Sequence, residues 1–272
     1  MQLSLFEWDI LAVGKGLNSL ARLDFHDARS CFSSVLEVLP ENTNAGRAME
    51  DLQAWEGVFR DMEGLAGESA LSFFWNKIVA FPFRSSEIYQ TLRQSLIKHL
   101  LTLLDGRATL YIPPDLCSGY LYLQLSDYSA AESHLRILVK SLPENGRLQG
   151  YLADAIWMQG RREIANAMYA KALLLAPHEV SVAELCNRGL ADLIKEHGPA
   201  ITPVYGFLEG VLPLVEQEAP PVTLEARSYE FLQQAEHARR LGKHNEMVAA
   251  RRGLKNLAPE VLQDYLDFLV GS

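Results

Sequence analysis

The sequence lacks the basic charge that nucleic-acid binding requires and the cysteine pattern of a zinc or disulfide-rich protein. Its formal net charge is −9, and phosphate contacts need a basic surface, so nucleic acid is not expected as a partner. Three cysteines are widely spaced and odd in number, without a CxxC or Cys/His pattern. We expect Cys31, Cys117 and Cys186 to be reduced core residues of a cytoplasmic protein that holds no metal and no cofactor.

Long apolar runs and targeting signals are also missing. The first 17 residues carry Glu7 and Asp9 within their apolar run and have no basic segment before it, unlike a signal peptide. No uncharged apolar run approaches 18 residues, so we expect neither a membrane span nor a membrane partner. With 49% hydrophobic and 22% charged residues, the chain can bury a substantial core and is not typical of disordered proteins.

Motifs that carry catalysis are incomplete. His178-Glu179 begins like a metalloprotease motif, but Val182 stands where the second histidine is needed. The run GKGLNS at 14–19 lacks the spacing of a phosphate-binding loop. No Gly-x-Ser-x-Gly, paired-carboxylate or Cys/His arrangement rises above chance, so the sequence does not predict an enzyme.

What the sequence does contain is a 34-residue period. Pro143 and Pro177 are 34 residues apart and each follows a predicted helix, which defines the windows 112–143 and 146–177. A fixed period of this size indicates stacked helical hairpins rather than a single compact core. Small residues at equivalent places let two helices approach closely, and larger ones fill the space beside the crossing. The small residues are Gly119, Ala131, Ala153 and Ala165, and the larger ones are Tyr122, Leu135, Ile156 and Tyr169.

These positions resemble the tetratricopeptide repeat (TPR), whose consensus has Gly-x-x-Tyr, an Ala, an aromatic, a second Ala and a terminal Pro. The resemblance is clearest over 112–177 and extends to 9–40 and 228–259, where Gly16, Ala28 and Phe32 match best. Asp115 and Gln149 stand where the consensus has Trp. The resemblance implies an all-α fold, an α-solenoid of antiparallel helix hairpins (a TPR-like superhelix), with diverged hairpins at 44–105 and 180–221.

The remaining chain is expected to be helical as well. We predict three regions in one continuous array: 1–111 with one TPR-like hairpin, 112–177 with the central pair, and 178–272 with a hairpin and a capping helix. Periodicity predicts helices over 44–62, from Ser85 or Ser86 to Leu104, and over 182–195. The segment 201–215 is interrupted by Pro and Gly and predicts a short or kinked helix, and 216–223 predicts a linker.

In the TPR family, first-helix side chains line a concave groove that binds a peptide or helix of a partner protein. Carried over to this chain, the implied groove residues are Leu116, Tyr120, Gln124, Arg147, Asp154, Trp157 and Met158. The alternative interpretation is that Tyr120, Trp157 and Met158 are covered by neighbouring helices of the same chain. The cations and amides with which some relatives bind a chaperone's C-terminal carboxylate are absent.

Three hypotheses for function therefore remain open. The first is a non-catalytic scaffold that binds a protein or peptide partner. The second is a self-associating homo-oligomer that buries the apolar stretches 71–83 and 201–215 between subunits, and the third is an enzyme with a pocket near 199–221. A basic cluster on the last hairpin is interpreted either as a solvated face or as a site for an acidic partner; it consists of Arg239, Arg240, Lys243, Arg251, Arg252 and Lys255.

Overall fold

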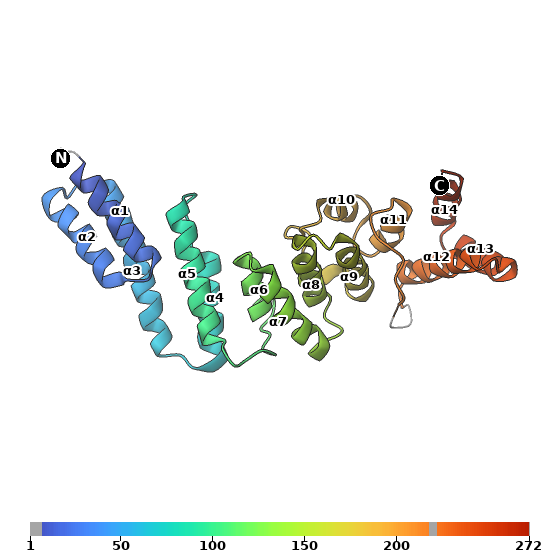
Figure 1. Cartoon of the computed structure of the whole chain (residues 1–272), viewed down its shortest axis with the longest axis horizontal. Helices are drawn as coiled ribbons and strands as arrows, with labels where there is room; N and C mark the ends of the chain where they lie inside the picture. Colours follow the sequence, from blue (N-terminus) through green and yellow to red (C-terminus); the bar gives the residue numbers. More distant parts are fainter. Residues whose placement is uncertain (1–6, 218–221, 272) are drawn as a thin grey trace. The chain divides into compact units, whose positions relative to one another are not determined.

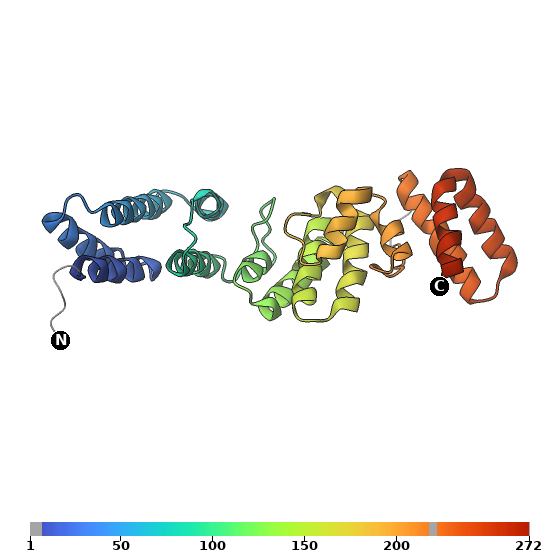
Figure 2. The same cartoon turned by 90° about the horizontal axis from the view of Figure 1, so that it is seen from above.

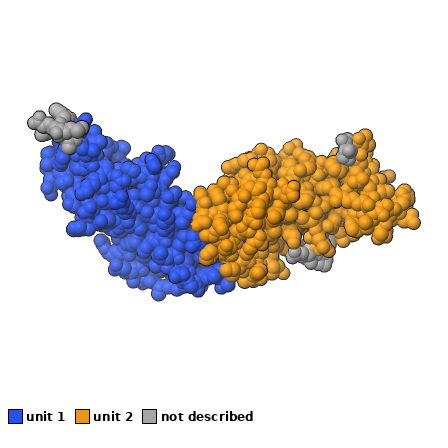
Figure 3. Space-filling model, viewed as in Figure 1, with its two compact units in different colours: residues 1–125 blue, residues 126–272 orange. Residues whose placement is uncertain are grey.

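The computed structural model describes residues 7–217 and 222–271, and its regular structure there is helical (Figure 1). Fourteen α-helices and one 3-10 turn lie in these ranges without any strand, apart from one isolated bridge between Ile112 and Leu116. The all-α prediction is confirmed at this level. The chain divides into two compact units, residues 1–125 and 126–272 (Figure 3). This boundary falls inside the 112–177 segment, and the three predicted regions stay a prediction.

The first unit contains helices α1 to α6. Their bounds are α1 Trp8–Ala21, α2 Phe25–Val38, α3 Thr43–Glu63, α4 Gly67–Ala80, α5 Glu87–Leu103 and α6 Ser118–Gln124. Local caps set several starts: the side chains of Asp24, Asn42 and Ser86 accept hydrogen bonds from the first turns of α2, α3 and α5. The predicted helices at 44–62 and up to Leu104 are thereby confirmed within one or two residues. Helix α6 is only seven residues long, and Pro113 and Pro114 lie in the non-helical segment before it.

Helices α1 and α2 pack closely because α1 has a glycine at the crossing. A Cβ atom placed on Gly16 would lie 2.4 Å from Cε1 of Phe32, so no larger residue fits there without a shift. Phe32, Ala28 and Val35 are fully buried against α1. The repeat positions predicted over 9–40 are therefore core positions of this helix pair.

The 71–83 stretch contributes an aromatic core to the same unit. Trp55 of α3 is buried with its ring centroid 6.3 Å from that of Phe74 and 5.0 Å from that of Phe81. Leu71, Phe74, Trp75 and Ile78 are buried, whereas Val79 is exposed. Most apolar surface of this stretch is thus covered by its own chain.

The second unit contains helices α7 to α14. Their bounds are α7 Tyr128–Ser141, α8 Gly146–Met158, α9 Arg162–Leu175, the 3-10 turn η1 Pro177–Glu179, α10 Arg188–His197, α11 Thr202–Leu208, α12 Leu224–Arg240, α13 His244–Leu257 and α14 Pro259–Gly271. The short helix expected in 201–215 is α11. Part of the predicted linker, residues 218–221, lies outside the described residues, as do residues 1–6 of the N-terminal run.

The helix predicted from Val182 is wrong in its first turn and a half. Residues 180–187 form an irregular segment, and α10 begins only at Arg188, after the Asn187 side chain accepts a hydrogen bond from Leu190 N. The backbone N–H of Cys186 is bonded to Asp154 of α8 instead of to a preceding turn. This tertiary contact overrides the local helical periodicity.

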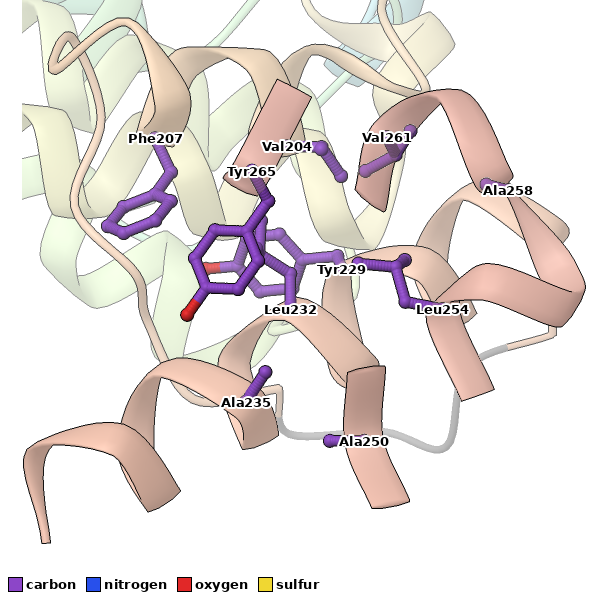
Figure 4. Close-up of a cluster of buried hydrophobic side chains, with 10 residues drawn as sticks. All are labelled: Val204, Phe207, Tyr229, Leu232, Ala235, Ala250, Leu254, Ala258, Val261 and Tyr265. Atoms are coloured by element: carbon purple, nitrogen blue, oxygen red, sulfur yellow. The ribbon is translucent and has the colours of Figure 1, made fainter. Parts of the chain in front are cut away.

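The C-terminal helices share a second core. Helix α13 packs against both α12 and α14 (Figures 1 and 2), and α11 packs against α12 and α14. Side chains from all four helices point into one cluster (Figure 4), formed by Val204, Phe207, Tyr229, Leu232, Ala235, Ala250, Leu254, Ala258, Val261 and Tyr265. Tyr265 of α14 is fully buried and its hydroxyl donates a hydrogen bond to Glu236 of α12, so α14 is part of this core.

Candidate partner-binding surface

The groove residues implied for the first unit lie mostly in its core. Leu116 and Tyr120 are buried, and the Tyr120 ring stands edge-on to the Trp75 ring of α4 at a centroid distance of 6.0 Å. Gln124 is half-buried and its Oε1 accepts a hydrogen bond from Arg93 Nη2 at 2.7 Å. For Tyr120, the structure therefore fits the alternative in which a neighbouring helix of the same chain covers the side chain.

Exposure along α8 changes from one end of the implied groove row to the other. Asp154 is buried, Arg147 and Trp157 are half-buried, and Met158 is exposed over 44% of its surface. Leu148 to Ile156 are all buried because α8 contacts both α7 and α9. Only the C-terminal end of α8 and Arg147 thus offer surface to a partner.

The Trp157 ring makes a cation–π contact with Arg162. The guanidinium of Arg162, an exposed residue in the first turn of α9, lies 5.3 Å from the Trp157 ring centroid. Trp157 also contacts Tyr169 at a centroid distance of 6.4 Å. Together with Met158, this arrangement presents an aromatic face, a guanidinium and a thioether on one small surface. We name Trp157, Met158 and Arg162 the α8–α9 end surface.

Asp154 is held inside the unit by three hydrogen-bond donors. Its Oδ1 accepts from Tyr169 Oη at 2.5 Å and from Cys186 N at 2.8 Å, and the Cys186 thiol also interacts with the carboxylate. Burial raises the pKa of Asp154 to about 6, the three hydrogen bonds oppose this rise, and the nearby Glu184 carboxylate adds to it. Burial also raises the pKa of the Cys186 thiol, to about 12, so this cysteine is not an activated nucleophile.

The segment 180–187 lies over the same stretch of α8. A Cβ atom placed on Gly150 would lie 3.9 Å from Cγ1 of Val180, which is ordinary van der Waals contact. Val180, Leu185 and Asn187 are buried, and Asn187 Nδ2 donates to Asn166 Oδ1 of α9. The chain itself therefore occupies the part of the implied groove around Gly150 and Asp154. Sequence reasoning missed this contact, and an acidic residue among the apolar residues of α8 was the signal that something covers it.

The basic cluster of the last helix pair is largely engaged within the unit. Arg239 Nε and Arg240 Nε each donate to the buried Glu236 at 2.8 Å, and Lys243 pairs with Glu246. The hydrogen bond from Arg239 is the largest cause that lowers the pKa of Glu236, to about 2, with burial opposing it and Arg240 and Tyr265 adding to it. The Arg251 guanidinium lies 5.4 Å from the Tyr265 ring centroid. This network supports the interpretation of a solvated face over that of a site for an acidic partner.

Around 199–221, four ionisable groups meet on the surface. The His197 ring stacks on Tyr205 at 3.9 Å, His197 Nε2 lies 3.3 Å from Glu209 Oε1, and Tyr205 Oη donates to Asp264 Oδ2 at 3.3 Å. In residues 7–217 and 222–271, no three His, Cys, Asp or Glu residues are grouped as metal ligands. Over the same residues, no helix has the length and apolarity to cross a membrane. The 201–215 stretch buries Val204, Phe207 and Leu212 within the unit.

Comparison with known proteins adds no assignment: no family model matches the chain, and neither a curated protein nor a solved structure is significantly similar to it.

Proposed function

We propose that the chain is a non-catalytic scaffold with a TPR-like α-solenoid arrangement, and that it binds an extended segment or helix of a partner protein. The close helix pairs support the arrangement. Gly16 meets Phe32 at the α1–α2 crossing, and a Cβ atom on Gly253 of α13 would lie 2.5 Å from Cε1 of Phe231 on α12. In the α8–α9 pair, Ala153 and Tyr169 are both fully buried. Gly16, Phe32, Ala153 and Tyr169 stand at small and aromatic positions of the repeat consensus, and their burial supports the proposed arrangement.

The α8–α9 end surface is the observation that carries the binding proposal. Aromatic residues, Met and Arg are enriched where proteins contact one another, and Trp and Arg are frequent anchors of affinity. Here a partly exposed Trp157 is stacked by Arg162 and followed by the exposed Met158. A partner segment with an apolar side chain beside a carboxylate fits such a surface, because the guanidinium remains available to pair with an acid.

The test compares two double variants, each of which replaces one exposed apolar residue and one exposed cationic residue by alanine. Met158→Ala with Arg162→Ala removes part of the α8–α9 end surface. The control, Ile137→Ala with Lys140→Ala, removes an exposed apolar side chain and an exposed cation from α7. Tagged proteins are used to capture partners from native lysate, followed by quantitative mass spectrometry. We expect the first variant to lose a partner by at least tenfold and the second to retain it, with thermal unfolding of both close to the wild type.

Equal capture by the first variant and the wild type would contradict the proposed surface. A loss of capture that accompanies a lower unfolding temperature would show instead that these side chains hold the fold. Tyr120→Ala is unsuitable for this purpose, because Tyr120 is buried against Trp75 and its removal leaves a cavity.

A further inference from the structure

We propose that residues 180–187 are an intrachain latch: they occupy the inner face of α8 around Gly150 and Asp154 and must move aside before a partner segment can extend along that face. The inference rests on the proposed function, since it concerns regulation of the same surface. It assigns a role to the buried carboxylate of Asp154, which the partner-binding surface itself does not use.

The latch is attached to α8 and α9 through a few identifiable contacts. Cys186 N donates to Asp154 Oδ1 at 2.8 Å, and Val180 lies against Gly150. Leu185 is buried, and Asn187 is bonded to Asn166 of α9. Asp154 is only one helical turn before Trp157 along α8, so the latch ends beside the exposed α8–α9 end surface.

The latch has the features of a displaceable segment. Between Glu179 and Arg188 the backbone forms neither helix nor strand, apart from a turn in which Glu184 N bonds to Ser181 O. Ala183 and Glu184 are exposed, and Ser181, Val182 and Cys186 are partly exposed. Segments with little regular structure and few buried contacts open locally at lower free energy than helices in the core.

Asp154 gives the latch a sensitivity to pH. The groups that face its carboxylate are Tyr169 from α9 and Cys186 and Glu184 from the latch; Arg188 at the start of α10 acts on Cys186. None of the groups that face it directly is a cation, and burial raises the pKa of Asp154 from 3.8 to about 6. When the latch opens, water reaches the carboxylate and its pKa returns toward the ordinary value. The closed state therefore binds the proton more tightly, and opening becomes more favourable as pH rises from about 5 to about 7.

The latch also indicates which chemistry could replace it. It presents two apolar side chains, Val180 and Leu185, to the unit, and one backbone N–H to a carboxylate. A competitor would be an extended peptide with apolar side chains at a similar separation and a free N–H between or beside them. A synthetic peptide with the sequence of residues 179–188 has this chemistry and serves as the probe.

The experiment is hydrogen–deuterium exchange of the full chain at about pH 5 and about pH 7, corrected for the intrinsic pH dependence of exchange. We expect the opening equilibrium of residues 180–187 to increase about tenfold between these two pH values, because the carboxylate changes its pKa between 3.8 and about 6 on opening. Asp154→Asn should abolish the increase, whereas the matched control Asp192→Asn, at an exposed position of α10, should keep it.

If the opening of residues 180–187 in the wild type does not depend on pH, the latch proposal is wrong. This measurement needs no variant, so it decides the proposal even if the Asp154→Asn protein does not fold. The labelled 179–188 peptide should bind the wild type saturably and with little dependence on pH, because the bound peptide buries the Asp154 carboxylate as the latch does. No saturable binding overturns the docking part. These outcomes are separate from those of the capture experiment, because opening is measured without a partner. If Met158→Ala with Arg162→Ala loses partner capture while exchange in the wild type does not depend on pH, the latch is rejected and the proposed binding surface is retained.

Discussion

Two helix pairs of the second unit each bury one carboxylate at the same position, Asp154 in α8 and Glu236 in α12. The two residues are 82 residues apart, as are Pro177 and Pro259, which close the respective pairs. Each carboxylate accepts a hydrogen bond from a tyrosine hydroxyl, Tyr169 or Tyr265. Each also holds the part of the chain that comes after its pair, the segment 180–187 in one case and α14 in the other.

The difference lies three and four residues further along each helix. In α12 these positions hold Arg239 and Arg240, which bond to Glu236, and in α8 they hold Trp157 and Met158. The pKa of Glu236 is lowered to about 2, whereas that of Asp154 is raised to about 6. In α12 these two positions carry cations that pair with the carboxylate. In α8 the same positions carry no charge, and their side chains are available for other contacts.

The two carboxylates therefore affect stability in opposite pH ranges. Glu236 has a folded pKa below its ordinary 4.5, so its contribution is complete above pH 4.5 and is lost as pH falls toward 2. Asp154 has a folded pKa above its ordinary 3.8, so the fold around it is most stable below pH 3.8 and weakens as pH rises to about 6. At neutral pH, the ionised Glu236 contributes its full stabilisation to the packing of α14, whereas the ionised Asp154 weakens the packing of residues 180–187.

The largest expected effect comes from Glu236→Gln. The substitution removes a charge that accepts from Arg239, Arg240 and Tyr265, and a hydrogen bond to a charged group contributes about 1.5 to 3 kcal/mol. We expect a loss of about 2 kcal/mol in the free energy that protects the α14 amides from exchange at neutral pH. Glu230→Gln on the same helix is the control and should change it by less than about 0.5 kcal/mol. Equal effects would mean that Glu236 does not hold α14.

Converting the α12 pair toward the α8 situation should have the next largest effect. Arg239→Ala with Arg240→Ala leaves Glu236 buried with the Tyr265 hydroxyl as a donor and removes both cations. Because both arginines are largely exposed, the loss at neutral pH should be about 1 kcal/mol. The pKa of Glu236 should rise, which moves the acid loss of α14 protection to a higher pH. A pH profile identical to the wild type would contradict the assigned role of the two arginines.

Removing the tyrosine hydroxyls should separate the two sites by a smaller amount. Tyr169→Phe deprives Asp154 of a donor where no cation compensates, so we expect a loss of about 1 kcal/mol. Tyr265→Phe leaves Glu236 with both arginines, and we expect about 0.5 kcal/mol. Urea unfolding at neutral pH measures both variants, and a larger loss for Tyr265→Phe would reverse the comparison.

The sequence predicted most of the helices and several tightly packed positions, but it did not predict which parts of the chain cover them. Apolar spacing and a cap at Ser86 located α5, and the 34-residue period located the buried Ala153 and Tyr169, because these signals depend on local geometry. The exposure of the groove positions depends on residues distant in sequence. Tyr120 is covered by Trp75 of α4, and Asp154 is covered by the segment after α9 that we expected to be helical from Val182.

The smallest and most specific change is Met158→Arg, which gives α8 the cation that α12 has at the same place. Arg240 reaches Glu236 from four residues along the helix, and an arginine at 158 stands at that separation from Asp154. Stability at neutral pH should increase by only a few tenths of a kcal/mol, because position 158 is exposed and solvent screens the pair.

The pKa of Asp154 is the sensitive readout of this variant. An arginine that pairs with the carboxylate should lower the pKa of Asp154 below about 6, measured from its side-chain carbon chemical shift in a pH titration. Met158→Gln matches the length of methionine without adding a charge and should leave the pKa in place. If both variants titrate alike, the cations at 239 and 240 are not what separates Glu236 from Asp154, and the depth of burial must be the cause.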